Sequence, residues 1–182
     1  MKLITTITDK EIIGKDIKFK GKYSKRIAAR AIVFNFEGKI ALLNAKKYKF
    51  HKLPGGGIEG NENVKETLER ELKEEIGCKV QITKEVGKII EIKNKYGQKQ
   101  LSYCYIAKAL SNGKSNLTKM EKEELGVKIE WVTVKEAIKL FEKDNPEDYT
   151  AKFIRYRDLI FLREIIKRYN IRIDKKRSQQ VC

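Results

Sequence analysis

The stretch from Gly56 to Cys78 constrains the fold of this chain more than any other part of the sequence. Its apolar residues recur every four positions and would form one stripe along a helix, namely Val64, Leu68, Leu72 and Ile76. Asn61 or Asn63 can cap such a helix, and Gly77 stands where a left-handed residue ends one. The sequence therefore predicts a helix over about residues 63–76.

The same stretch carries three carboxylates on one face of the expected helix. Glu71, Glu74 and Glu75 stand at positions i, i+3 and i+4, beside the apolar stripe. We expect them at the rim of the core, neither buried nor fully in bulk water. A hard divalent cation would offset their mutual repulsion, because Mg²⁺ binds through a few carboxylates together with substrate phosphates.

A simpler interpretation is a solvated helix with ion pairs along its surface. Opposite charges stand four residues apart in three pairs, namely Glu66–Arg70, Arg70–Glu74 and Glu69–Lys73. The segment before the helix favours the metal site. Pro54 stiffens it, and Gly55–Gly57 allow backbone conformations that other residues cannot hold. Such a loop can turn its carbonyl and N–H groups toward a metal and phosphates.

The full spacing resembles the Nudix box, G-x5-E-x7-R-E-U-x-E-E-x-G-U, in which U is a bulky apolar residue. Every fixed position matches, namely Gly56, Glu62, Arg70, Glu71, Glu74, Glu75 and Gly77, with Leu72 at the first apolar position. Cys78 replaces the usual aliphatic residue at the last position, where it packs as a small hydrophobe. The resemblance implies an α/β fold: a Nudix-type α/β/α sandwich with a mixed β-sheet, a catalytic helix at 63–76 and C-terminal helices.

The resemblance also implies hydrolysis of a diphosphate bond in a nucleoside diphosphate linked to some group X, with Mg²⁺ as cofactor and Mn²⁺ as a substitute. The implied metal ligands are Glu71, Glu74, Glu75 and the carbonyl of Gly55. Arg70 would orient these carboxylates through a forked hydrogen bond. Glu62 and Gly77 would be structural residues that hold the two ends of the helix.

The general base stays open between two interpretations. A carboxylate of the box, Glu74 or Glu75, could activate the attacking water. A Glu from the polar loop at 111–126 could do so instead, with Glu124 preferred over Glu121 and Glu123. Phosphate contacts are expected from residues beside the presumed cleft, namely Lys46, Lys47, Lys52, Gly56 and Gly57.

Residues beyond the box favour a nucleoside triphosphate or a modified nucleotide as the substrate. No proline stands between Pro54 and Pro146, which argues against the ADP-ribose group. Tyr96 suits the dinucleoside polyphosphate hydrolases, although an ordinary hairpin turn also explains it. A non-catalytic nucleotide-sensing domain is the alternative of another class, but this chain keeps every box carboxylate. Isomerase chemistry is disfavoured because no cysteine precedes Cys78.

The rest of the sequence predicts strands around the box helix and helices after it. Strands are expected as a pair within 2–20 and at 27–34, 39–45, 79–92, 100–109 and 127–133, and helices at 134–143 and 149–169. We divide the chain into an N-terminal strand extension (1–22), a Nudix hydrolase domain (23–146), a C-terminal helix packed on it (147–173) and a flexible basic tail (174–182).

Composition limits the partners of the chain. Its net charge of +16 attracts anions such as nucleotide polyphosphates, but the lysines are scattered and predict no nucleic-acid partner. The cysteines show no paired spacing and no apolar run would cross a membrane, so we expect a cytoplasmic protein without a membrane partner. A homodimer stays open. His51 and Trp131 are expected to pack in the fold rather than to act on a substrate.

Overall fold

The computed structural model describes residues 1–111, 115, 117 and 126–169 of the chain. In this part a seven-stranded sheet has the order β1-β5-β6-β2-β3-β4, and β7 pairs with β3. The strands are β1 (Leu3–Ile7), β2 (Ser24–Phe34), β3 (Ile40–Ala45), β4 (Phe50–Lys52), β5 (Val80–Lys93), β6 (Gln98–Ala109) and β7 (Val127–Val132). The helices are α1 (Asp9–Ile13), α2 (Val64–Ile76), α3 (Val134–Lys143) and α4 (Tyr149–Tyr169), with short 3-10 turns η1 (Lys46–Tyr48) and η2 (Asn94–Tyr96).

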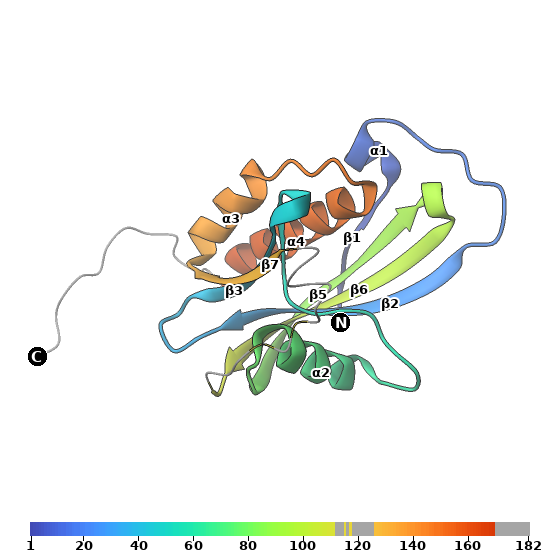
Figure 1. The fold of residues 1–182 in the computed structure, drawn as a ribbon. Helices are drawn as coiled ribbons and strands as arrows, with labels where there is room; N and C mark the ends of the chain where they lie inside the picture. Colours follow the sequence, from blue (N-terminus) through green and yellow to red (C-terminus); the bar gives the residue numbers. More distant parts are fainter. Residues whose placement is uncertain (112–114, 116, 118–125, 170–182) are drawn as a thin grey trace, which may run out of the picture.

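Helices cover both faces of the sheet (Figure 1). On one face α2 packs Leu68 and Leu72 against strand residues such as Ala31. On the other face α3 and α4 build a second core that includes Phe141 and Phe161. The sheet is mixed, because β2 runs parallel to β6 while β5 and β6 are antiparallel. The expected α/β/α sandwich with a mixed sheet is confirmed.

Strand β2 is central and holds the glycine-rich loop in place. Its second half, from Ala28 to Val33, is buried toward both faces because helices cover both, and it is apolar except for Arg30. The amide of Ala29 donates to the carbonyl of Gly56 at 2.9 Å, and the amide of Ala31 donates to that of Pro54 at 3.0 Å. These bonds fasten the loop along β2.

The expected box helix is confirmed as α2, with the caps that the sequence indicates. The side chain of Asn63 accepts hydrogen bonds from the amides of Lys65 and Glu66, and the Glu66 carboxylate accepts one from the amide of Asn63. Gly77 ends the helix with a φ of 69°. The carboxylates of the box therefore start from a well-defined helical frame.

The expected strand pair within residues 2–20 is wrong in its second half. Strand β1 forms and pairs with β5, but residues 9–13 are the short helix α1. Thr8 and Glu11 form a capping box, and Gly14 closes the helix with a φ of 73°. The T-x-x-E spacing is a helix-start signature that outweighs the strand pattern here. The other expected strands and helices are confirmed, with shifts of a few residues at their ends.

Candidate active site

Two glycines of the loop lie in close contact with their surroundings. Gly55 has a φ of 126°, and a Cβ built on it would lie 2.2 Å from the carbonyl oxygen of Ala29. A Cβ on Gly56 would lie 1.8 Å from Oε1 of Glu71. Both distances are far below van der Waals contact. Glycine is therefore required at Gly55, which meets the backbone of β2, whereas a side chain at Gly56 would displace the Glu71 carboxylate.

Glu75 joins the box helix to this loop. Its Oε2 accepts a hydrogen bond from the amide of Gly55 at 2.6 Å, and its Oε1 pairs with Nζ of Lys52 at 2.8 Å. Glu71, one helical turn earlier, lies against Gly56. Two carboxylates one helical turn apart, Glu71 and Glu75, thus contact the neighbouring loop residues Gly56 and Gly55.

The expectation that all three carboxylates lie at the rim of the core is wrong for Glu75. The exposed fraction of its side chain is 5%, against 14% for Glu71 and 52% for Glu74. Glu75 is buried because the loop folds over this part of α2, which the helical pattern alone does not show. Burying a charge is costly unless it is paired, and both oxygens of Glu75 are paired.

Arg70 holds the other carboxylates through several contacts. Its forked donors reach Glu62, with Nε to Oε1 at 2.7 Å and Nη2 to Oε2 at 3.0 Å. Its Nη2 also donates to the carbonyl of Gly57 at 3.2 Å, and Nη1 reaches Glu71 at 3.1 Å and Glu74 at 3.3 Å. The bond from Arg70 lowers the pKa of Glu62 to about 2. Arg70 therefore ties the start of the loop–helix junction to the carboxylate face.

The solvated-helix interpretation accounts for little of this pattern. Of the pairs expected four residues apart, Arg70–Glu74 forms. In the described part of the chain, Glu66 and Glu69 make no ion pair with Arg70 or Lys73, and Glu66 caps the helix instead. Arg70 makes two hydrogen bonds to Glu62, which lies outside α2.

The donor set fits a hard divalent cation in its chemistry. Burial, followed by repulsion from Glu75, raises the pKa of Glu71, and a nearby cation would relieve the repulsion. Among the residues that the structure describes, the carbonyl of Gly55 accepts no hydrogen bond. Carboxylate and carbonyl oxygens are the ligands that Mg²⁺ prefers.

The carboxylates are not gathered into a metal site in the described residues. No three His, Cys, Asp or Glu side chains come together there as metal ligands. Instead, two of the carboxylates pair with cations of the protein, Glu71 with Arg70 and Glu75 with Lys52. A divalent ion would therefore compete with Lys52 and Arg70 for the carboxylates.

The three lysines expected to bind phosphate lie in different places. Lys52 contacts the box through Glu75. Lys46 and Lys47 lie on the turn η1, where Lys46 lines a hollow of about 510 Å³ beside His51 and Lys47 lines another. Of these three lysines, only Lys52 contacts a box carboxylate within the described residues.

A third hollow, of about 240 Å³, extends from Lys52 toward the start of α4. Its walls are largely apolar, and they are formed by Ala45, Tyr48, Phe50, Lys52, Val127, Asp148, Thr150, Ala151 and Ile154. Since Lys52 belongs both to this hollow and to the Glu75 contact, the hollow adjoins the box.

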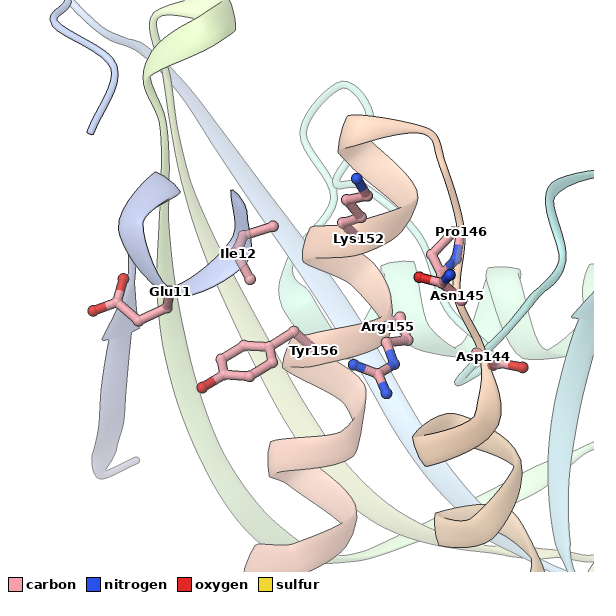
Figure 2. A pocket seen from close by; sticks show the side chains of 8 residues that line it. All are labelled: Glu11, Ile12, Asp144, Asn145, Pro146, Lys152, Arg155 and Tyr156. Carbon is pink, nitrogen blue, oxygen red and sulfur yellow. The ribbon is translucent and has the colours of Figure 1, made fainter. Parts of the chain in front are cut away.

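Figure 2 shows a further hollow, of about 290 Å³, between α1 and the turn from α3 to α4. Arg155 lines it, but its guanidinium donates to the carbonyls of Phe141 and Glu142 and so caps α3. The carboxylate of Glu11 points away from the hollow in this view. No box residue lines it, so it is separate from the candidate site.

The sequence did not reveal that a second carboxylate holds the loop from the opposite face of the sheet. Asp158 of α4 accepts a hydrogen bond from the amide of Leu53 at 2.8 Å. Arg157 pairs with Asp158 and with Glu91, and all three side chains are fully buried. The sequence does contain a hint of these buried ion pairs, namely charged residues such as Arg30 within apolar segments. A charge that is buried requires a partner of opposite charge.

The other residues discussed from the sequence lie away from the box carboxylates or outside the described residues. His51 is buried and its Nδ1 lies 3.0 Å from Asp144, and Trp131 packs at the edge of the α2 core, so both are packing residues as expected. Tyr96 is exposed at the tip of the β5–β6 hairpin and stacks edge-on against Tyr149. The proposed loop bases, Glu121, Glu123 and Glu124, lie outside the described residues, as does the basic tail.

Solved structures share this fold at low sequence identity. The MutT protein of Methanosarcina mazei is 18% identical, with 80% of this chain and 98% of that chain covered and a TM-score of 0.54. The ORF135 protein of E. coli is 18% identical, with 84% and 96% covered and a TM-score of 0.55. The Ap4A hydrolase of C. elegans is 16% identical, with 79% and 98% covered and a TM-score of 0.54. Among curated proteins, none matches the sequence.

The sequence match defines the class of protein more directly. The family model described as NUDIX domain matches residues 24–153, which include the box, the loop and the start of α4. The chain belongs to the Nudix family. It is a Nudix hydrolase, an enzyme that acts on phosphoric anhydride bonds. Within the described residues, no helix is long and apolar enough to cross a membrane.

Proposed function

We propose that the protein is a Mg²⁺-dependent hydrolase of a nucleoside diphosphate linked to X, with a nucleoside triphosphate or modified nucleotide as the substrate. One observation supports this most strongly. Glu75 is buried against the amide of Gly55 and the ammonium of Lys52. A buried carboxylate beside a glycine-rich loop and a lysine can hold a metal and leave the lysine for phosphate.

The residues for the metal are Glu71, Glu74, Glu75 and the carbonyl of Gly55. A bound Mg²⁺ supplies charge neutralisation at the phosphoryl oxygens and lowers the pKa of bound water. Arg70 keeps Glu71 and Glu74 oriented from one side through its guanidinium. Lys52 would exchange Glu75 for a phosphate oxygen of the substrate, and the N–H groups of Gly56 and Gly57 would face the phosphates.

The proton acceptor for the attacking water is proposed among the carboxylates that remain accessible. Glu74 is half exposed, and its one contact in the described part of the chain is Arg70 at 3.3 Å. Glu124 remains the alternative base on the late loop. Replacing each with Gln separates them, because loss of the base flattens the acidic limb of the pH–rate profile.

The organic part of the substrate is proposed to occupy the hollow beside Lys52. Tyr48 and Phe50 give it aromatic walls, and Ile154 of α4 also lines it. A base or another flat apolar group would suit these walls. Tyr96 does not line this hollow but stacks on Tyr149 beside it, so the lining supports a site for a single nucleotide rather than recognition at Tyr96.

The test is turnover of a substrate panel with Mg²⁺ or Mn²⁺, with the products separated by chromatography. We expect triphosphates or modified nucleotides to release pyrophosphate or phosphate, and Glu75→Gln to abolish this release. Turnover of dinucleoside polyphosphates alone would establish the alternative substrate. Tight nucleotide binding without turnover of any panel member would make the protein a sensor and contradict the proposal.

A further inference from the structure

The loop that carries the Gly55 carbonyl is held at four successive points. Asp158 accepts from the amide of Leu53 at 2.8 Å, and the carbonyl of Pro54 accepts from β2. Glu75 then accepts from the amide of Gly55 at 2.6 Å, and the carbonyl of Gly56 again accepts from β2. The two carboxylates come from helices on opposite faces of the sheet. The loop is thus clamped on both sides, and the carbonyl of Gly55 is left without a hydrogen bond within the described residues.

The clamp on the α4 side is itself fixed by a buried ion cluster. Nε of Arg157 lies 2.8 Å from Oδ1 of Asp158, which leaves Oδ2 for the amide of Leu53. Nη1 of Arg157 lies 3.2 Å from Glu91, and Glu91 pairs with Lys93 at 3.0 Å. Glu91 also accepts from two neutral side chains of β6. Since every member is buried, Asp158 has one orientation in which both of its oxygens are paired.

We propose that Asp158, oriented by Arg157, is a positioning residue that keeps the Gly55 carbonyl and Glu75 in register for the divalent cation. Asp158 touches neither substrate nor metal, and it acts through the backbone from Leu53 to Gly55. This proposal rests on the proposed function of the box as a metal site. It assigns a role in that site to α4, which carries no box residue.

The decisive variant is Asp158→Asn, because an amide has one acceptor oxygen where the carboxylate has two. Because Arg157 and Leu53 donate to different oxygens of Asp158, the amide NH2 of the variant would face one of these two donors in the same geometry. The matched control is Asp9→Asn. Asp9 is also fully buried, and its two oxygens accept from the hydroxyl of Tyr149 and the amide of Asn94, away from the loop. Both variants lose one buried carboxylate that holds a backbone amide.

The first measurement is Mn²⁺ binding without substrate, by electron paramagnetic resonance of the free ion. We expect Asp158→Asn to weaken binding about tenfold, as the loss of an outer-sphere partner does, and Asp9→Asn to leave it within about twofold of wild type. The second is amide hydrogen exchange at Gly55 by NMR without metal. We expect faster exchange in Asp158→Asn than in the control at equal distance below each melting temperature.

Equal Mn²⁺ affinity and equal exchange at Gly55 in both variants would overturn the proposal. If Asp158→Asn does not fold, Arg157→Lys decides, because lysine keeps the charge but cannot hold Asp158 and Glu91 in the same fork. Unchanged Mn²⁺ affinity in Arg157→Lys would then overturn it. Failure of the wild-type protein to bind Mn²⁺ would instead refute the proposed metal function, while the exchange comparison would still report on the clamp.

Discussion

The glycine-rich loop is held by one carboxylate from α2 and one from α4, and the two differ in how deeply their cation partner is buried. Glu75 and Asp158 each accept a hydrogen bond from a loop amide and each pair with one cation. The cation of Glu75 is Lys52, whose side chain is 21% exposed, and that of Asp158 is Arg157, which is fully buried. A single flexible lysine can move away, whereas Arg157 is held by Glu91 as well.

The two carboxylates thus differ in the exposure of their cation partners, which is partial for Lys52 and absent for Arg157. A buried ion pair adds little net stability, but removing one member leaves an uncompensated charge in the interior. The α4 side therefore resists rearrangement. On the α2 side, burial and the repulsion from Glu75 raise the pKa of Glu71, so the proposed cation would relieve a repulsion there.

The largest effect is expected from Glu75→Gln, which tests whether the α2 side is the reactive one. The metal loses a charged ligand, so turnover should fall by about a thousandfold or more while the fold persists. Steady-state kinetics with circular dichroism measure this, and the exposed Glu69→Gln on the same helix is the control. Near-normal turnover that still requires Mg²⁺ would mean that Glu75 is not a metal ligand.

Arg157→Met tests whether the α4 side is the rigid one. It leaves the buried Asp158 and Glu91 without their shared cation, and should lower the free energy of unfolding by about 3–5 kcal/mol. Urea denaturation measures the change. Arg163→Met, also on α4, removes an exposed pair with Glu142 of α3 and should cost less than about 1 kcal/mol. Equal costs would remove the contrast between buried and exposed pairs.

Gly56→Ala tests how closely the loop must approach the carboxylates. The added methyl group would overlap Glu71, so Glu71 must move by more than about 1 Å, and turnover should drop by about a hundredfold. Gly60→Ala, where a Cβ meets no atom within 4 Å, is the control. Turnover similar to that of the control would show that the position of Glu71 is not critical.

His51→Asn tests the link between β4 and α3 through its dependence on pH. Burial lowers the pKa of His51, but the bond and charge of Asp144 and the charge of Glu130 outweigh it and raise the pKa. The stabilisation is therefore complete below the unfolded value of 6.5 and is lost as the pH rises through the folded value. We expect the variant to lose about 1 kcal/mol more at acidic than at alkaline pH, by urea denaturation. An equal loss at both would refute the charged pairing.

The smallest change in the free energy of unfolding is expected from Glu71→Gln in the absence of metal. This variant tests whether Glu71 serves function at a cost in stability. Removing the repulsion with Glu75 should raise the free energy of unfolding in chelator by about 0.5 kcal/mol, the size of a like-charge pair one turn apart. Turnover with Mg²⁺ should fall in the same variant. A loss of stability in chelator would show that the pair with Arg70 outweighs the repulsion.

The features predicted from the sequence depend on contacts between residues close along the chain, and the unpredicted ones depend on contacts between distant residues. Asn63, Gly77 and the stripe through Leu72 act over one or two helical turns, so their spacing was sufficient to predict α2. The capping box of Thr8 and Glu11 is equally local, and its T-x-x-E spacing stands in the sequence although the neighbouring residues resemble a strand. By contrast, Asp158 meets Leu53 across 105 positions, and no local spacing contains that contact.

The sequence by itself determined the class of the protein and the box helix α2, because both depend on neighbours within a few residues. Only the tertiary structure decided that Glu75 is buried, that Lys52 contacts it, and that α4 holds the loop from behind. The physical reason is that burial and pairing of charges arise where distant segments meet, and a carboxylate on a helix has no fixed partner until the chain folds around it.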